Sequence, residues 1–114
     1  MTQMIYHMCP AEAWAAAVLS GRYDGTADDL RDGFIHFSTA DQLAESARRH
    51  RAGQPGLALI AVESARLGAR LKWEPSRGGD LFPHLYGPLD PGETASVRPL
   101  PLGPDGEHVL PPLQ

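Results

Sequence analysis

The chain has 114 residues, a length that suits one domain with a single core, and we take residues 1–114 as that domain. It carries 10 Lys and Arg against 14 Asp and Glu, and the resulting formal charge of −4 argues against nucleic acid as its usual partner. Cys9 is the only cysteine, which excludes an internal disulfide, and no apolar run approaches membrane-spanning length. We therefore expect a cytoplasmic protein that does not enter a membrane.

The beginning of the chain predicts a strand followed by a helix. Residues 4–9 alternate in the manner of a strand, with His7 and Cys9 on one face. Pro10 suits the first helical position, and Gly21 suits the residue that follows a helix. Between them, apolar residues recur at the spacing of an amphipathic helix, at Ala11, Trp14, Ala15 and Val18.

The stretch over residues 33–42 predicts a turn, a short strand and the first turn of a second helix. Its strand is aromatic and β-branched, and alternation places His36 and Ser38 on one face. Thr39 and Gln42 have the spacing of a capping box. Thr26 and Asp29 have the same spacing and predict one short helical turn upstream, through Leu30. A polar pair beside a helix N-terminus is a common position for an anionic or polar ligand.

The rest of the chain predicts mostly strands, so that the fold class is α+β. The second helix ends before Gly53. We interpret the three arginines at its end, Arg48, Arg49 and Arg51, as a solvated patch that complements the helix dipole. Pro83 confines its segment to the edge of a sheet or to an irregular stretch. The expected segments are a central strand at 57–62, a strand at 70–74, a polar loop at 75–80, an extended segment at 81–87, a terminal hairpin formed by 94–102 and 107–110, and a Pro-rich tail from about residue 99.

Three histidines, His7, His36 and His84, lie inside apolar or aromatic segments, whereas His50 and His108 lie in polar surroundings. An imidazole is costly to bury unless its nitrogens find partners. We therefore expect the three to line a common cleft.

Three kinds of site fit these residues. Three imidazoles and a water make a usual catalytic zinc shell, and Cys9 with His36 would make a nucleophile and base. The third kind is a hydrogen-bonding site for a nucleotide or sugar, built from His7, His36, Ser38, Tyr86 and Glu74. Glu74 shares a strand face with Lys72, which is typical of a solvated surface but also allows a general base or a ribose contact.

Four segments in order resemble the bacterial family known as domain of unknown function 952. They are Ile5–His7, Gly33–Ser38 with Gln42, Leu71–Glu74 and Phe82–Leu89, and together they extend over roughly residues 4 to 98. The resemblance implies an ADP-ribosyltransferase-like fold, with two short, mostly antiparallel sheets and two main helices around an NAD-binding cleft.

The same resemblance implies roles for individual residues. His7 matches a first-strand residue that contacts the ribose beside nicotinamide, and His36 with Ser38 matches the second motif. The third motif is usually a glutamate or glutamine on a late strand, but here His84 and Tyr86 stand in the corresponding segment. RNA 2′-phosphotransferases of that fold also lack the glutamate.

We therefore predict catalytic roles for His36, His84 and Glu74, ligand-binding roles for His7, Ser38 and Tyr86, and no metal ligands. The first hypothesis is an ADP-ribosyl- or phosphotransferase-type enzyme that binds NAD or a related nucleotide, with NAD as a substrate. The second is a non-catalytic module for a small ligand or a protein, and the third is a metal-dependent hydrolase. The expected partner is a nucleotide, an RNA end stays open, and the oligomeric state is undetermined. Loss of His36 or His7 is expected to abolish ligand binding with little change in stability.

Overall fold

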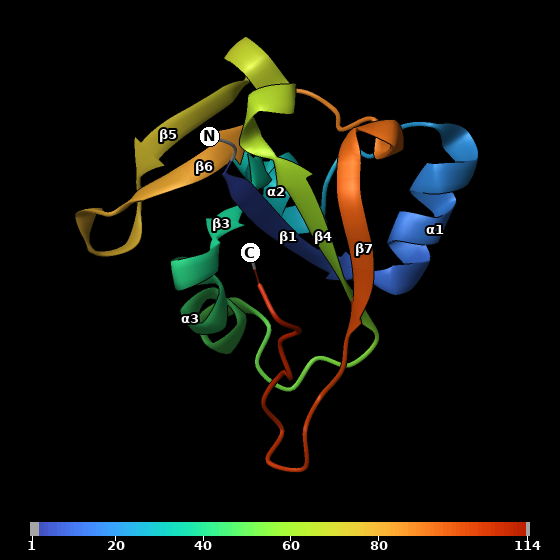
Figure 1. Cartoon of the computed structure of the whole chain (residues 1–114), viewed down its shortest axis with the longest axis vertical. Coiled ribbons are helices and arrows are strands. Elements are labelled where there is room, and N and C mark those ends of the chain that lie inside the picture. Colours follow the sequence, from blue (N-terminus) through green and yellow to red (C-terminus); the bar gives the residue numbers. More distant parts are fainter. Residues whose placement is uncertain (1–2, 114) are drawn as a thin grey trace.

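The computed structural model describes residues 3–113, apart from the side chain of Arg77, and it contains two antiparallel sheets with helices beside them (Figure 1). The larger sheet has the strand order β3-β1-β4-β7, and the smaller has the order β2-β6-β5. The predicted α+β class with two antiparallel sheets is confirmed. No described helix is long and apolar enough to cross a membrane.

The strands are β1 (Met4–Pro10), β2 (Ile35–His36), β3 (Ser38–Thr39), β4 (Leu57–Glu63), β5 (Leu71–Pro75), β6 (Leu81–Leu85) and β7 (Thr94–Leu100). The helices are α1 (Ala11–Ser20), α2 (Ala27–Asp32) and α3 (Ala40–His50), with short 3₁₀ turns at Ser64–Arg70, Arg77–Gly79 and Pro91–Glu93.

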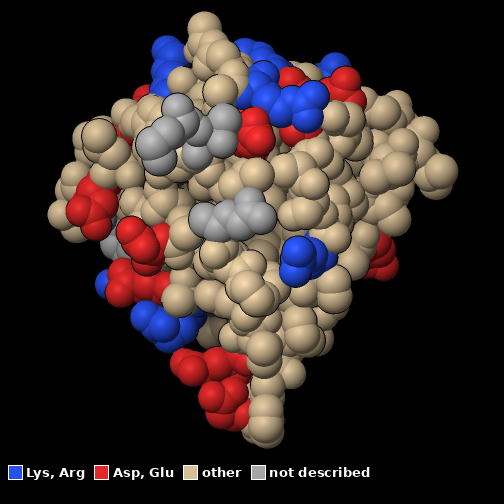
Figure 2. Space-filling view, in the orientation of Figure 1, with Lys and Arg blue, Asp and Glu red and all other residues tan. Residues whose placement is uncertain are grey.

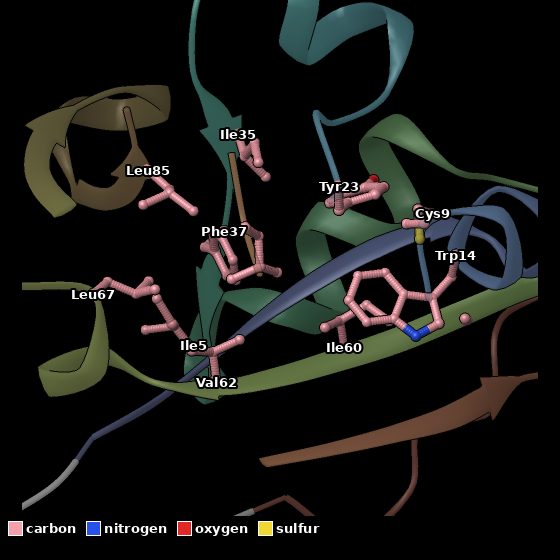
Figure 3. Packing of buried hydrophobic residues seen from close by; sticks show 13 residues of the cluster. Ile5, Cys9, Trp14, Tyr23, Ile35, Phe37, Ile60, Val62, Leu67 and Leu85 are labelled. Atoms are coloured by element: carbon pink, nitrogen blue, oxygen red, sulfur yellow. The ribbon is translucent and has the colours of Figure 1, made fainter. Parts of the chain in front are cut away.

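The larger sheet separates two apolar clusters. Its strand β4 lies between β1 and β7 and is buried from Leu57 to Val62, as its continuous apolar run predicted. One face packs against α1 and the smaller sheet, where Ile5, Ile60 and Val62 point toward Phe37 and Leu85 (Figure 3). The other face packs against α3 and the C-terminal segment. This second cluster contains Tyr6, Met8, Leu43, Ala47, Leu57, Leu59, Ala61 and Leu100, with Leu110 and Leu113 packed against it.

The strand predicted before α3 is divided at Phe37, and its two halves belong to different sheets. His36 pairs with His84 of β6, whereas Ser38 pairs with Tyr6 of β1. Phe37 lies between them, with 2% of its surface exposed, and its N–H donates to the carbonyl of Pro83 at 3.0 Å. Because the chain changes sheets here, simple alternation from residue 34 to residue 38 does not hold. This position is called the sheet junction below.

Local signals around the junction act as predicted. Gly33 follows α2 with a φ of 88°, a left-handed conformation that ends the helix. Gln42 accepts a hydrogen bond from the backbone N–H of Thr39 at 3.0 Å and donates one to the carbonyl of Leu81 at 2.9 Å. The first bond caps α3, and the second ties α3 to β6.

Three expectations for the strands and helices are wrong. Strand β6 is the middle strand of its sheet, so Pro83 does not mark an edge; its carbonyl is still paired, with Phe37. Trp73, which would point inward if Lys72 and Glu74 formed a solvated face, is 38% exposed because β5 is the edge strand. In α1 the buried residues are Trp14 and Ala17, whereas Val18, predicted to be buried, is 54% exposed. The buried face of the helix therefore passes through Ala17 and not through Val18.

The C-terminal segment forms part of the predicted hairpin. The N–H of Gly103 donates to the carbonyl of Glu107 at 2.7 Å, and Leu102 bridges to His108. The returning arm is not a strand beyond that bridge, and it packs Leu110 and Leu113 against the second cluster. Figure 2, in the same orientation as Figure 1, shows acidic side chains at the lower edge and basic side chains along the upper edge.

The junction residue gives a first prediction. Replacing Phe37 by Ala should lower the free energy of unfolding by about 3–5 kcal/mol, because the substitution leaves a cavity between the two sheets. Urea denaturation measures this loss. Leu19→Ala serves as the control, since Leu19 is 91% exposed on α1 and its loss should cost less than about 0.5 kcal/mol. Equal losses in the two variants would show that the junction does not hold the sheets together.

Candidate functional site

A cavity of about 150 Å³ lies beside the sheet junction. Its walls come from β1, α2, the junction, the end of α3, β6 and the loop before β6. The lining residues are Tyr6, His7, Met8, Asp28, Asp29, Arg31, Asp32, His36, Phe37, Ser38, Ser46, His50, Arg51, Ser76, Phe82 and His84. All three histidines from the apolar segments, together with Ser38, therefore line one cavity.

His7 is held by protein groups at both ring nitrogens. It is 3% exposed, with Nδ1 at 2.6 Å from the carbonyl oxygen of His36 and Nε2 at 2.6 Å from the hydroxyl of Tyr23. A carbonyl only accepts, so Nδ1 carries the proton and donates, and Nε2 accepts from Tyr23. Burial lowers the pKa of His7 below its usual value of 6.5. His7 is thus a neutral histidine that fixes the backbone at the sheet junction.

Asp29, which the sequence suggested only as a helix cap, is a buried carboxylate at the wall of the cavity. It is 2% exposed, and its Oδ2 accepts from the N–H of Thr26 at 2.7 Å, as the capping-box spacing predicted. Its Oδ1 accepts from the backbone N–H of His36 at 3.1 Å and from the ring Nδ1 of His36 at 2.5 Å. Gly25 lies so close that a Cβ there would be 2.6 Å from the Cβ of Asp29. The hydrogen bonds of the carboxylate to Thr26 and His36 therefore hold α2 against β2.

His36 lies between two carboxylates of α2. Besides Asp29 at Nδ1, its Nε2 is 3.1 Å from Oδ2 of Asp32. The hydrogen bond to Asp29 raises the pKa of His36 above 6.5, against the opposing effect of burial. Burial by itself would raise the pKa of Asp29, but the hydrogen bonds from His36 and Thr26 outweigh it and lower that pKa. The carboxylates at its two ring nitrogens thus favour the charged form of His36, in which both nitrogens donate.

His84 occupies the opposite electrostatic environment. It is 5% exposed, its Nδ1 lies 2.8 Å from Oε1 of Glu74, and the hydroxyl of Tyr86 donates to the same oxygen at 2.8 Å. Burial lowers the pKa of His84 despite the opposing effect of Glu74. The hydrogen bonds from His84 and Tyr86 in turn lower the pKa of Glu74. His84 is therefore neutral near pH 7, with its proton on Nδ1.

The smaller sheet explains why these side chains meet. His36 and His84 are direct cross-strand partners, and their ring centroids are 5.6 Å apart. Residues two apart share a face, which brings Phe34 beside His36 and Tyr86 beside His84. The ring of Phe34 stacks on the ring of His84, with 4.0 Å between the ring centroids. One face of the small sheet thus carries the polar cluster, and the other carries Ile35 and Leu85 in the core.

Arg51 follows the last residue of α3 and turns toward the cavity. Its Nε is buried, and it is the one buried side-chain nitrogen or oxygen that has no hydrogen-bond partner among the residues described in the structure. Arg48 and Arg49 instead reach the exposed carboxylate of Glu45, at 4.0 and 3.4 Å. The interpretation of all three arginines as a solvated patch therefore fails for Arg51.

The remaining predicted site residues do not all reach the cavity directly. Ser38 donates to Oγ of Ser46 at 2.9 Å, and Glu74 and Tyr86 reach the cavity only through His84. Cys9 is fully buried, and burial raises the pKa of its thiol, which does not favour the Cys9–His36 nucleophile pair. Within residues 3–113, no group of three or more His, Cys, Asp or Glu side chains is arranged to hold a metal ion.

Three residues that matter here were missed in the sequence. The capping-box spacing located Asp29 but gave no sign of its bond to His36, because that contact depends on how α2 packs against β2. Phe34 looked like an ordinary strand residue, and Arg51 looked like its neighbours Arg48 and Arg49. Only Phe34 carried a usable signal, since alternation placed it on the face of His36.

Comparison with known proteins identifies the family. The family described as "Protein of unknown function (DUF952)" matches residues 8–97 of the chain, well over half of its length. The chain belongs to the DUF952 family. It is similar to protein CC0527 from Caulobacter crescentus, whose crystal structure shares 46% sequence identity and a TM-score of 0.90, with 93% of each chain covered. The solution structure of CC0527 shares 47% identity and a TM-score of 0.83, with 91% of this chain and 90% of that chain covered. No curated protein matches.

Membership of the DUF952 family is what the four sequence segments predicted. The descriptions of the family and of CC0527 name no activity, and they do not support the finer likeness to ADP-ribosyltransferases. The shared fold of this chain and CC0527 is the two-sheet arrangement described above.

The charged state of His36 gives a second prediction. In Asp29→Asn an amide replaces the carboxylate, so the pKa of His36, followed by NMR titration of its ring protons, should fall back toward 6.5 or below. The variant should also lose about 1–3 kcal/mol of unfolding free energy, because a buried hydrogen-bonding partner is removed. Asp24→Asn is the control, because Asp24 is exposed and its partner, Arg22, is also exposed and away from His36 in the chain. An unchanged pKa of His36 in Asp29→Asn would contradict the assignment.

The same interaction predicts a pH dependence. The pKa of His36 is higher in the folded state than its unfolded value of 6.5, so protonated His36 stabilises the folded protein. This contribution is fully present below pH 6.5 and is lost as the pH rises through the folded pKa. The difference in unfolding free energy between the wild type and His36→Gln should therefore shrink as pH increases above about 6.5. Urea denaturation at a series of pH values measures it. A difference that grows with pH would rule out a charged His36.

A third prediction concerns His7. The sequence suggested that His7→Ala would change stability little, but both ring nitrogens are bonded inside the protein. We now expect His7→Ala to lower the unfolding free energy by at least 1–3 kcal/mol, because the hydroxyl of Tyr23 and the carbonyl of His36 lose their partner. His50→Ala, at an exposed residue of the same cavity, is the comparison, and its melting temperature should stay closer to that of the wild type.

Proposed function

We propose that the cavity binds the phosphate-bearing end of a nucleotide such as NAD or a related molecule, with Arg51 contacting the phosphate. The observation that carries this proposal is Arg51, a residue of the cavity wall whose buried Nε has no partner among the described residues. A guanidinium group left in this way is suited to a phosphate or carboxylate, which it binds through paired N–H donors. A buried donor without a partner is costly, so a ligand that satisfies it gains affinity.

The other cations of the cavity are already engaged. Arg31 contacts Asp28 at 3.1 Å and Asp32 at 3.2 Å, and His36 lies between Asp29 and Asp32. The three carboxylates of α2 thus face two cations, Arg31 and His36, and one negative charge remains. The guanidinium of Arg51, at the same cavity, offsets that charge for an anion that enters beside it.

The size of the cavity limits what enters it. Pockets that enclose a drug-sized ligand measure about 300–1,000 Å³, so a cavity of about 150 Å³ holds a phosphate with part of a ribose and not a whole dinucleotide. The remainder of NAD or of ADP-ribose would lie on the surface. An ADP-ribosyltransferase-like fold, transferase activity and a cytoplasmic location are part of this same proposal.

A non-catalytic binding module is the second candidate. It is favoured by the hydrogen bonds of His7 and His36, whose ring nitrogens are all engaged by protein groups. Histidines committed in this way position a site more readily than they exchange protons with a ligand.

A fourth prediction tests the binding site. Isothermal titration with ADP, ADP-ribose, NAD and pyrophosphate should detect at least one ligand, and Arg51→Ala should weaken its binding about ten- to a hundredfold, as expected for a charged hydrogen bond of about 1.5–3 kcal/mol. Arg51→Lys should recover only part of the loss, because lysine cannot make the paired contact. Arg48→Ala, three residues before Arg51 in sequence but paired with Glu45 outside the cavity, should bind as the wild type does.

The unliganded Arg51→Ala protein should melt close to the wild type, since Nε of Arg51 gives up no bond within the described part of the chain. Binding that is equally strong in wild type and Arg51→Ala would contradict the proposal. So would the absence of binding by every phosphate compound at millimolar concentration.

A further inference from the structure

The cavity holds two histidines that are oriented in the same way by carboxylates from different elements. Nδ1 of His36 is held by Asp29 of α2, and Nδ1 of His84 is held by Glu74 of β5. In each ring the carboxylate fixes the orientation and leaves Nε2 on the far side. The two rings are 5.6 Å apart and lie against the same cavity as Arg51.

The surroundings of these two rings have opposite effects on their protonation. The pKa of His36 is raised, first by its hydrogen bond to Asp29, whereas the pKa of His84 is lowered, first by burial. The carboxylates at both nitrogens of His36 favour its doubly protonated form, and Glu74 at Nδ1 of His84 places the proton of that neutral ring on Nδ1, which leaves Nε2 as an acceptor. Two titratable groups whose environments separate their pKa values are suited to act as an acid and a base in one reaction.

We infer that His84 and His36 are the general base and general acid for cleavage of a ribonucleotide phosphodiester by its own neighbouring 2′-hydroxyl. The inference rests on the proposed function, because Arg51 must hold the phosphate. It adds to that function the chemical class of the substrate and the reaction.

The step is balanced in atoms and protons. Nε2 of His84 takes the proton of the 2′-hydroxyl while that oxygen forms a bond to phosphorus. The bond from phosphorus to the 5′-oxygen of the next nucleoside breaks, and that oxygen takes the proton from Nε2 of His36. The products are a 2′,3′-cyclic phosphate and a free 5′-hydroxyl. His84 then releases its proton to water and His36 takes one up, so no oxidant, metal or further reactant enters the reaction.

The interaction of His36 with Asp32 must be exchanged for the substrate. Nε2 of His36 is 3.1 Å from Asp32, whose side chain is 37% exposed and so is free to move toward solvent. Asp29, at the other nitrogen, is buried and stays in place. The charged groups that act on His36 are Asp28, Asp29 and Asp32 of α2, and those that act on His84 are Glu74 of β5, His36 and Asp32. Arg31, His50 and Arg51 also line the cavity.

The experiment incubates the full chain with a dinucleoside monophosphate, such as uridylyl-adenosine, in EDTA. Products are followed by ³¹P NMR, where the cyclic phosphate is resolved from the diester. We expect the wild type to release cyclic phosphate and nucleoside, and to leave the 2′-deoxy substrate intact. His84→Gln and His36→Gln should each lower kcat by about 10²–10⁴-fold, the usual contribution of a general acid or base.

Glu74 is a positioning residue in this scheme, and Glu74→Gln provides a second, independent variant. Its carboxyl group lies at the outer side of His84, so its loss should leave the fold intact. We expect a lower kcat with little change in KM. The lower, acid-side limb of the pH–rate profile should shift to more acidic pH, because the carboxylate raises the pKa of His84. A role restricted to stability would not move that limb.

His108→Gln is the matched histidine control. Its Nε2 donates to the carbonyl of Gln54, away from the cavity, so the variant should cleave as fast as the wild type. Cleavage that is lost in His84→Gln but kept in His108→Gln excludes a contaminating nuclease. Equal cleavage by all variants would overturn the inference.

The two proposals fail in different ways. Arg51-dependent binding of ADP or of the dinucleotide, without any cleavage by the wild type between pH 5 and pH 8, overturns the acid–base inference and leaves the binding proposal standing. Absence of both binding and cleavage overturns both proposals.

Discussion

The carboxylate of Asp29 is the group on which the site depends. It is almost completely buried, and it accepts hydrogen bonds from the backbone of Thr26, the backbone of His36 and the ring of His36. A buried charge is stable only when it is paired and hydrogen-bonded, so these three contacts act together to fix α2, β2 and one imidazole in a single arrangement. Without Asp29, the helix would keep its other cap contacts, but His36 would lose the carboxylate at Nδ1 and keep Asp32 at Nε2.

The charge of His36 also affects its neighbour. The His36 ring lies 5.6 Å from His84, and its positive charge helps to lower the pKa of His84. Glu74 acts in the opposite direction and orients the His84 ring. The neutral state of His84 thus arises from burial together with a nearby cation, and the charged state of His36 arises from two nearby carboxylates. Cross-strand pairing brings these two environments together on one face of the small sheet.

Local sequence signals predicted what local interactions determine. The capping boxes at Thr26 and Thr39, the left-handed glycine at residue 33 and the buried strand β4 follow from residue types a few positions apart. The histidines were found because polar groups in apolar segments need partners. The break at Phe37, the central place of Pro83 and the inward turn of Arg51 were not predictable, because each depends on a segment far away in sequence. Arg48 and Arg51 look alike in the chain and differ only in what surrounds them.

The sheet junction affects how rigid the cavity is for the ligand binding that we propose. Residues 35–39 run without a loop from the small sheet into the large one, and the hydrogen bonds of Phe37 and His7 hold this crossing on both sides. The two sheets therefore cannot swing apart as hinged lobes do when they close around a ligand. The walls of the cavity are already in place before anything binds, so association spends little free energy on ordering the protein. For the ligand binding that we propose, affinity would then need few contacts, and selection would depend on shape and charge and not on closure of the two sheets.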